Sequence, residues 1–170
     1  MPAYIALLRA LNLMGTRGLP MTELTTVCTD LGFQSVRTWI ASGNVVLQSR
    51  KSERAVKSTL EAALTQRMGR PVGVMVRTAP EIAAVLAANP FPANHNSKVM
   101  AIFLDAAPAP DALANLKNQT KEQLRLGLRE IYVYYPDGQG QSRLIIPALK
   151  HGTARNMNTI AKLAEIAAEL

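Results

Sequence analysis

The sequence is poor in the residues that build metal and redox sites. It contains one cysteine, Cys28, and two histidines, His95 and His151, among 170 residues. A zinc site needs three or four Cys, His or carboxylate ligands at short, defined spacings, so we expect no metal and no other cofactor. A single cysteine also cannot form a disulfide within the chain. This is typical of proteins in a reducing compartment and predicts a cytoplasmic protein.

Long hydrophobic runs and well-known catalytic motifs are missing as well. No segment approaches the ~18 consecutive apolar residues of a membrane-spanning helix, and the start MPAYIALLRALN lacks the basic region and long apolar run of a secretory signal. We therefore expect no membrane partner. The sequence also lacks a Walker loop, a dinucleotide-binding fingerprint and a nucleophile elbow. With the missing metal-ligand spacing, these absences disfavour metal hydrolases, P-loop enzymes and Ser-His-Asp hydrolases.

The composition that is present favours a globular, basic protein. Hydrophobic residues make up 48% of the chain and charged residues 18%, which is enough apolar material for a core. The net charge is +7, and residues 1–85 hold ten basic side chains against five acidic ones. A basic half suits anionic partners such as nucleic acid, nucleotides or phosphorylated metabolites. The alternative is a surface of scattered, solvated charges without a ligand.

The first 78 residues predict a β-α-β-β-α-β order. AYIALLRALNL is apolar at almost every position, which predicts a central strand that is buried on both faces. A helix follows between Pro20 and Gly32, and two β-rich runs, SVRTWIA and NVVLQS, form a hairpin. Ser52 begins a second helix that Gly69 ends, and VGVMVRT is the fourth strand. This order is that of a ferredoxin-like, or α/β-plait, fold.

The second half predicts an incomplete copy of the same unit. Thr78 and Glu81 have the spacing of a capping box and begin a helix, which with the loop after it forms a connection over residues 79–97. KVMAIFLD is a strand, PDALANLKN a short helix, and EQLRLG with EIYVYYP a second hairpin. No fourth strand is evident, and an amphipathic helix ends the chain. We predict an α+β protein with tandem ferredoxin-like halves over residues 1–78 and 98–170, the second incomplete and carrying the C-terminal helix.

Several blocks of the chain resemble one protein family in their content and order. They are YIALLRALNLMGTRGLPMTEL, LGFQSVRTWIASGNVVLQS, VRT, NPF, YYPDGQGQSRL and TARNMNTIAKL. In these blocks the chain is similar to an uncharacterised, mainly bacterial family known as domain of unknown function 1697, and the resemblance runs nearly end to end. It implies tandem α/β-plait halves and implies no established activity.

The end of the first predicted strand carries the first candidate ligand-binding residues, Arg9, Asn12 and Arg17. A buried guanidinium without a partner costs several kcal/mol, so Arg9 either forms a structural ion pair or binds a ligand. Arg17 lies in a loop with two glycines that precedes a helix N-terminus. Such a loop can hold an anion through its cation and the free helix amides, and it can also be a simple turn.

Ser42 and Asn44 are the candidates of the hairpin. Together with Gly43 they suit a tight turn, because glycine and asparagine tolerate positive φ. In the functional alternative, Ser42 and Asn44 present donors beside Arg9 and Asn12. That alternative requires the register of the sheet to bring the two segments to the same end.

The third candidate cluster is HGTARNMNT, residues 151–159, just before the last helix. Thr153 or Asn156 can cap the helix, which leaves several donors without a role. Arg155 is unfavourable at a helix N-terminus, where the dipole favours acids. One hypothesis is an anion held by Arg155 and oriented by Asn156 and Asn158, and the other is a buried polar clamp that ties the last helix to the first domain.

Three functional classes remain open on these residues. The leading one is a non-enzymatic binding protein for a phosphate-bearing small molecule, a nucleotide or nucleic acid. The second is a small hydrolase by analogy with acylphosphatases, which share the split fold; Arg17 and Asn44 would hold phosphate and water. The third is a protein-interaction module with no ligand.

Overall fold

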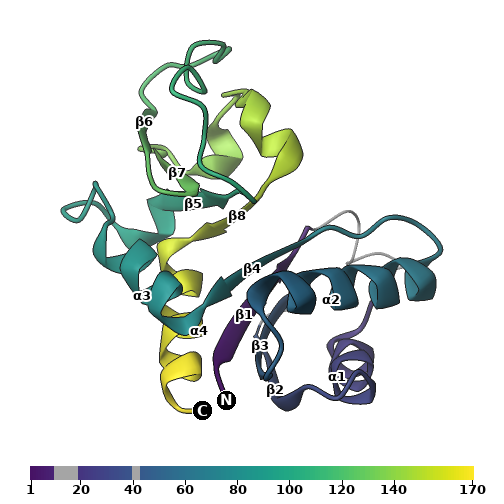
Figure 1. Cartoon of the computed structure of the whole chain (residues 1–170). Coiled ribbons are helices and arrows are strands. Elements are labelled where there is room, and N and C mark those ends of the chain that lie inside the picture. Colours follow the sequence, from purple (N-terminus) through teal and green to yellow (C-terminus); the bar gives the residue numbers. More distant parts are fainter. Residues whose placement is uncertain (10–18, 40–42) are drawn as a thin grey trace. The chain divides into compact units, whose positions relative to one another are not determined.

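The computed structural model describes residues 1–9, 19–39 and 43–170 (Figure 1). The candidate residues Asn12, Arg17 and Ser42 lie outside the described residues. The chain divides into two compact units. Unit 1 comprises Met1–Ile82 and Lys162–Leu170, and unit 2 comprises Ala83–Ala161.

Unit 1 contains the predicted β-α-β-β-α-β order. Its elements are β1 (Ala3–Leu8), α1 (Met21–Asp30), β2 (Gln34–Trp39), β3 (Asn44–Gln48), α2 (Glu53–Met68) and β4 (Val74–Thr78). The four strands form an antiparallel sheet in the order β2-β3-β1-β4. The prediction that the first strand is central is therefore confirmed, although β1 ends at Leu8 and Arg9 lies beyond it.

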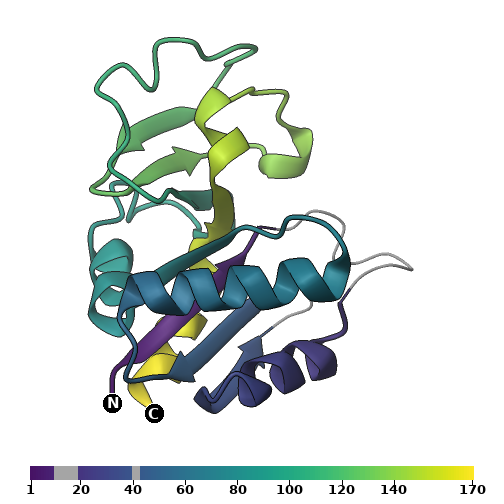
Figure 2. The same ribbon diagram turned by 45° about the vertical axis from the view of Figure 1, so that its right-hand side comes forward.

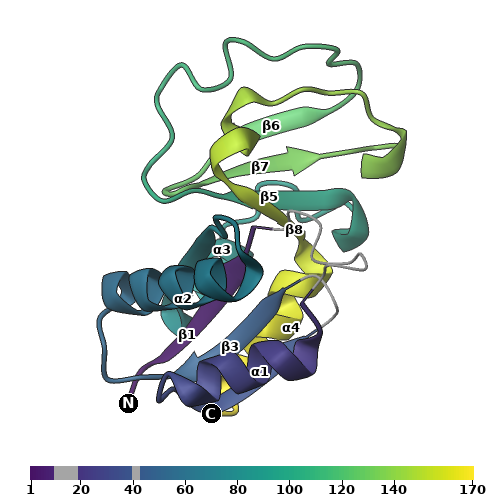
Figure 3. The same ribbon diagram turned by 90° about the vertical axis from the view of Figure 1, so that its right-hand side faces the viewer.

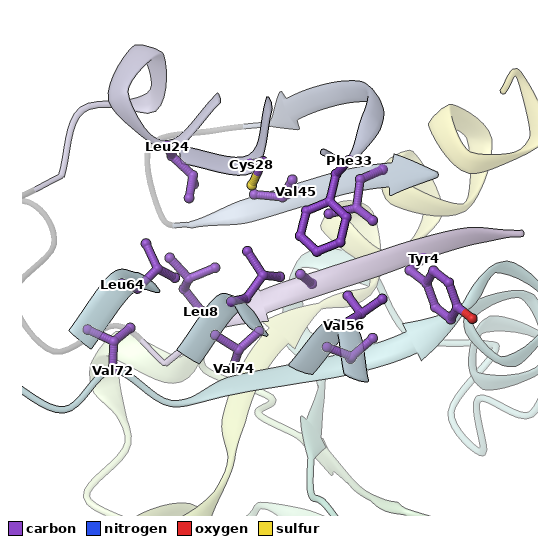
Figure 4. Packing of buried hydrophobic residues seen from close by; sticks show 14 of the residues in the cluster. Tyr4, Leu8, Leu24, Cys28, Phe33, Val45, Val56, Leu64, Val72 and Val74 are labelled. Atoms are coloured by element: carbon purple, nitrogen blue, oxygen red, sulfur yellow. The ribbon is translucent and has the colours of Figure 1, made fainter. Parts of the chain in front are cut away.

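The core of unit 1 lies between the sheet and its two helices. Alternate residues of β1, Tyr4, Ala6 and Leu8, belong to one buried cluster with residues of α1 and α2. Figure 4 shows Leu24 of α1 and Leu64 of α2 pointing toward this sheet face, and Figure 2 shows α2 lying across the strands. The alternation of side chains along a strand thus fixes which face each residue covers.

The opposite face of the first sheet is buried too. Ile5 and Leu7 of β1 are fully buried, which confirms the prediction of a strand covered on both faces. The last residues of the chain belong to unit 1 and contact β2 there. Arg37 pairs with Glu169 at 2.6 Å, and the Lys162 ammonium lies 5.1 Å from the centre of the Trp39 ring.

Local capping chemistry behaves as the sequence predicts. The Ser52 hydroxyl accepts a hydrogen bond from the Ala55 amide at 3.2 Å, and Gly69 ends α2 in the left-handed region at φ 70°. At the start of α3 (Ala79–Ala87), the Thr78 amide donates to the Glu81 carboxylate at 2.9 Å and the Glu81 amide donates to the Thr78 hydroxyl at 3.2 Å. These reciprocal bonds are a capping box.

Unit 2 contains a second four-stranded antiparallel sheet (Figure 3). Its elements are the 3₁₀ turn η1 (Asn96–Lys98), β5 (Val99–Phe103), β6 (Gln123–Leu126), β7 (Glu130–Tyr134), the 3₁₀ turns η2 (Gln139–Gln141) and η3 (Pro147–His151), β8 (Thr153–Asn156) and the start of α4 (Met157–Ala168). The strand order β6-β7-β5-β8 repeats that of the first sheet, with β5 in the place of β1 and β8 in the place of β4.

Two expectations for the second half are wrong. The copy has a fourth strand, because β8 pairs with β5 from Phe103↔Thr153 to Met100↔Asn156. The segment PDALANLKN is not a helix but a series of turns, with i→i+3 hydrogen bonds such as Ala112 N–H to the Ala109 carbonyl at 2.9 Å. Near the end of this segment, Lys117 exchanges backbone hydrogen bonds with Ile145 instead of continuing a helical ladder.

Within residues 1–9, 19–39 and 43–170, no helix is long and apolar enough to cross a membrane.

Candidate functional site

The register of the first sheet brings two of the predicted segments to one edge. Leu7 of β1 pairs with Asn44 of β3, and the Leu8 amide donates to the Gly43 carbonyl at 2.9 Å. The Arg9 amide then donates to the Gly73 carbonyl at 2.8 Å, just before β4 begins. Arg9 and Asn44 therefore lie at the same end of the sheet, which is the condition that the functional alternative for the hairpin required.

The Arg9 side chain is half-buried and lies over Gly73. A Cβ atom added at Gly73 would lie 3.5 Å from Arg9 Cδ, so the aliphatic stem of the arginine contacts this backbone. Glu61 is the acid at this place, 3.9 Å from the same Cβ position. Its Oε2 atom already accepts hydrogen bonds from the Lys57 ammonium and from the Val74 amide, each at 2.9 Å. The nearby carboxylate thus has a cation partner on its own helix.

Asn44 has a structural contact inside the hairpin. It is fully buried, and its side-chain amide donates to the Trp39 carbonyl at 3.0 Å. The hydrogen bond joins the last residue of β2 to the first residue of β3, next to Gly43 at φ 81°. These contacts agree with the turn alternative for this residue.

Arg155 lies in β8 opposite Ala101, not in a helix. It is only 6% exposed, and its guanidinium donates to the Thr153 hydroxyl at 2.7 Å and to the Ala154 carbonyl at 2.9 Å. Burial lowers the pKa of Arg155 to about 10, because the charged form loses hydration. Arg155 is thus the residue before the cap of α4 and not part of the helix itself.

The asparagines of the same cluster have different surroundings. Asn156 is the cap of α4, since its side-chain oxygen accepts from the Thr159 amide at 2.9 Å. Asn158, in the first turn of α4, is exposed. Of the two caps that the sequence allowed, Asn156 is therefore the one that the structure uses.

A cavity in unit 2 contains residues that the sequence analysis did not select. Its volume is about 470 Å³, within the range of small-molecule pockets. Three segments line it: the residues that follow β5, the turns over residues 108–115, and η3. Its polar lining residues are Asp105, Asp111, Asn115 and His151, and we call it the Asp111 cavity.

The only signal for this cavity in the sequence is indirect. Two aspartates flank the alanine- and proline-rich stretch AAPAP directly after a buried strand, and His151 stands in the cluster before the last helix. No spacing connects His151 with the aspartates, because they are some forty residues apart and meet only through the pairing of β5 with β8. In the described part of the chain, no group of three His, Cys, Asp or Glu residues could hold a metal ion.

The fold is that of an α+β protein built from two four-stranded antiparallel sheets that share one strand order. The chain belongs to the family described as protein of unknown function (DUF1697), whose profile matches residues 1–132. No curated protein matches the chain. Among solved structures, the conserved bacterial protein SP0830 from Streptococcus pneumoniae is similar over 98% of both chains, with a TM-score of 0.78 and 21% sequence identity. At that identity the likeness shows the fold.

Proposed function

We propose that the protein binds a phosphate-bearing ligand, without turning it over, at the edge of the first sheet where β1 ends. The observation that carries the proposal is the antiparallel register at this edge, which aligns Arg9 with the hairpin residues Gly43 and Asn44 and with Gly73. The long Arg9 side chain lies there over a glycine, at a position where the nearby Glu61 already pairs with Lys57.

The sequence around this edge supplies what an anion site needs. In the sequence, Arg9 is followed by Asn12, Gly15, Arg17 and Gly18, a segment that the sequence predicts to be a loop before α1. Arginine binds phosphate through paired N–H donors, and glycines allow a ligand to approach the backbone closely. Asn12, Arg17 and Ser42 enter the proposal from the sequence alone.

The proposal is tested with three anionic probes: inorganic pyrophosphate, ATP and a 12-nucleotide oligouridylate. Thermal-shift screening identifies the probe that stabilises the protein, and titration calorimetry then gives its Kd. Arg9→Gln removes one charged donor and is expected to weaken binding by about 10- to 100-fold, which corresponds to the ~1.5–3 kcal/mol of a charge-assisted hydrogen bond.

Arg54→Gln is the matched control. It removes the same charge from an exposed arginine in the first turn of α2. That helix begins near Lys51, whose carbonyl accepts from the Tyr4 hydroxyl at 2.7 Å, so Arg54 lies at the opposite end of β1 from Arg9. Equal loss of binding in both variants would contradict a local site and indicate general attraction to a basic surface. Binding of none of the three probes would overturn the proposal.

Salt dependence separates the ligand classes. A protein that neutralises several phosphates releases their counterions, and its affinity then falls steeply with salt. Oligouridylate binding that weakens far more than ATP binding between 50 and 200 mM salt would assign nucleic acid, and a parallel, shallow dependence would assign a nucleotide or phosphorylated metabolite.

The acylphosphatase-like alternative has less support. It needs the Asn44 amide to face a ligand and a water, whereas this amide is buried and donates to Trp39. Release of phosphate from acetyl phosphate, lost on Arg17→Ala, is the result that would favour the hydrolase.

The ligand hypothesis for Arg155, Asn156 and Asn158 stays a separate proposal. It predicts that Arg155→Ala abolishes binding of the same probes, whereas the clamp alternative predicts lower stability with binding unchanged. The contacts of Arg155 with Thr153 and Ala154 lie within its own strand, and they support a structural role of the guanidinium in β8.

We also propose that unit 1 is an α/β plait, that is, a ferredoxin-like fold, and that unit 2 is an incomplete copy of it, with turns where unit 1 has helices. The shared strand order β2-β3-β1-β4 and β6-β7-β5-β8 supports this proposal, as does the position of α1 and α2 on one face of the first sheet.

A further inference from the structure

The Asp111 cavity differs in chemistry from the proposed phosphate site and is independent of it. The cavity belongs entirely to unit 2, and all its lining residues lie between Leu104 and His151. Two carboxylates, Asp105 and Asp111, line it. Such a lining repels phosphate, so the occupant must come from another chemical class.

The distribution of charge identifies that class. Residues 83–161 contain eight basic and five acidic side chains. Two of the five acids line the cavity, and none of the eight bases does. A cavity that collects carboxylates in a protein of net charge +7 is complementary to a cation.

The rest of the lining favours an apolar body attached to that cation. Leu104, Pro108 and Pro147 line the cavity together with four alanines. Asn115 and His151 add hydrogen-bonding groups among these apolar surfaces. Pockets for small organic ligands have this composition, mostly apolar with a few placed polar groups.

The walls of the cavity are held by backbone contacts. The turns over residues 108–115 contain the bonds Ala112 N–H to Ala109 carbonyl and Ala114 N–H to Asp111 carbonyl, each 2.9 Å. Lys117 and Ile145 exchange two backbone hydrogen bonds at 3.2 and 2.8 Å, which tie the turn segment to the chain before η3. The cavity is therefore part of the folded unit rather than a gap between loose loops.

We propose that the Asp111 cavity binds a small organic cation with an apolar or aromatic body, whose ammonium group pairs with the carboxylates that line the cavity, Asp105 and Asp111. A volume of about 470 Å³ accommodates a bicyclic aromatic amine. The carboxylates recognise the ammonium group, and the alanine and proline surfaces cover the body.

Three probes with one aromatic body test the charge preference: tryptamine as the cation, tryptophol as the neutral analogue and indole-3-propionate as the anion. Binding is followed by chemical shifts of backbone amides in ¹H–¹⁵N spectra of the full-length protein at pH 7.5. We expect tryptamine to shift the amides of Ala106, Ala112 and Ala148. Tryptophol is expected to bind at least tenfold more weakly, and indole-3-propionate not to bind.

Variants locate the binding. Asp111→Asn keeps the shape of the side chain and is expected to reduce tryptamine affinity about five- to tenfold without changing the weak tryptophol binding. Ala109→Phe fills the cavity from an exposed position and is expected to abolish both. Asp137→Asn is the matched control, because Asp137 is an exposed acid of the same unit that does not line the cavity. Melting curves of all variants show that they are folded.

The outcomes that overturn the proposal are distinct. Equal affinity for the three probes would mean an apolar pocket without recognition of charge. Equal effects of Asp111→Asn and Asp137→Asn would mean nonspecific attraction, and no tryptamine binding at millimolar concentration would remove the site. The same amide shifts produced by MgCl₂ or CaCl₂ alone at lower concentration than by tryptamine would assign a metal ion instead.

Discussion

Replacement of Gly152 by alanine is expected to destabilise unit 2 because of a steric clash. Gly152 is buried between η3 and β8, and its φ of −130° and ψ of −175° are extended values that any residue adopts. The backbone therefore does not require glycine. A Cβ atom at this position would lie 2.6 Å from the Phe103 carbonyl oxygen, 2.9 Å from Leu104 Cδ2 and 3.0 Å from Ile102 Cγ2.

The size of the effect follows from these distances. Real Cβ atoms essentially never approach closer than 3.0 Å, so β5 and the chain before β8 must separate by at least 0.4 Å. Overpacking of this kind costs about 1–3 kcal/mol, and we expect about 2–3 because the closest atom is backbone. For a chain of this length that is a fall in Tm of about 5–10 °C, measured by circular dichroism.

Gly140→Ala is the control for this experiment. The added Cβ there meets no atom within 4 Å, and the position does not have positive φ, so we expect a change of less than ~0.5 kcal/mol. A Gly152→Ala protein that melts within 1 °C of the parent would refute the steric argument.

The remaining predictions concern buried polar groups. Burial raises the pKa of Cys28 to about 12, so iodoacetamide at pH 8 should label this thiol only in urea; fast labelling of the folded protein would contradict its burial. Several hydrogen bonds lower the pKa of Glu122 to about 2, and the bond from the Ser142 hydroxyl has the largest effect. A carboxyl group whose pKa is lower in the folded than in the unfolded protein stabilises the fold at pH values above its unfolded pKa, and this stabilisation is lost as the pH falls toward 2. The decrease in Tm caused by Ser142→Ala should therefore be greatest near neutral pH and disappear at the acid end. Arg155→Ala leaves a cavity and removes two hydrogen bonds, for an expected loss of about 2–4 kcal/mol in urea unfolding; a loss below ~0.5 kcal/mol would contradict the clamp.

The elements that the sequence predicts correctly are determined by residues that are close together in the sequence. The apolar run of β1, the Ser52 and Gly69 ends of α2 and the capping box of α3 each depend on residues a few positions apart. β8 is different, because TARN has neither the length nor the alternation of a typical strand. It is a strand because β5 offers it an edge to pair with, and that pairing joins residues about fifty positions apart.

The same distinction applies to the candidate sites. Local chemistry selected Arg9 and Asn44, but only the register of β1 with β3 shows that they share one edge. Arg155 was interpreted as a residue at the N-terminus of the last helix, and the structure places it in β8, directly before the Asn156 cap of that helix. The Asp111 cavity was missed because its walls come from three segments that are brought together by the second sheet.

The two sheets share a strand order but differ in two connections. Helices α1 and α2 follow β1 and β3 in the first sheet, whereas the 3₁₀ turns η2 and η3 lie between β7 and β8, and turns join β5 to β6. The ladders of β5 with β7 and β8 use no residue of these turns, which pack on the sheet through Ala112, Leu113 and Leu116. A connection that lies outside the strand ladders tolerates exchange of its residues without a change in strand pairing. Substitutions in this segment therefore change the lining of the Asp111 cavity while the strand register stays the same.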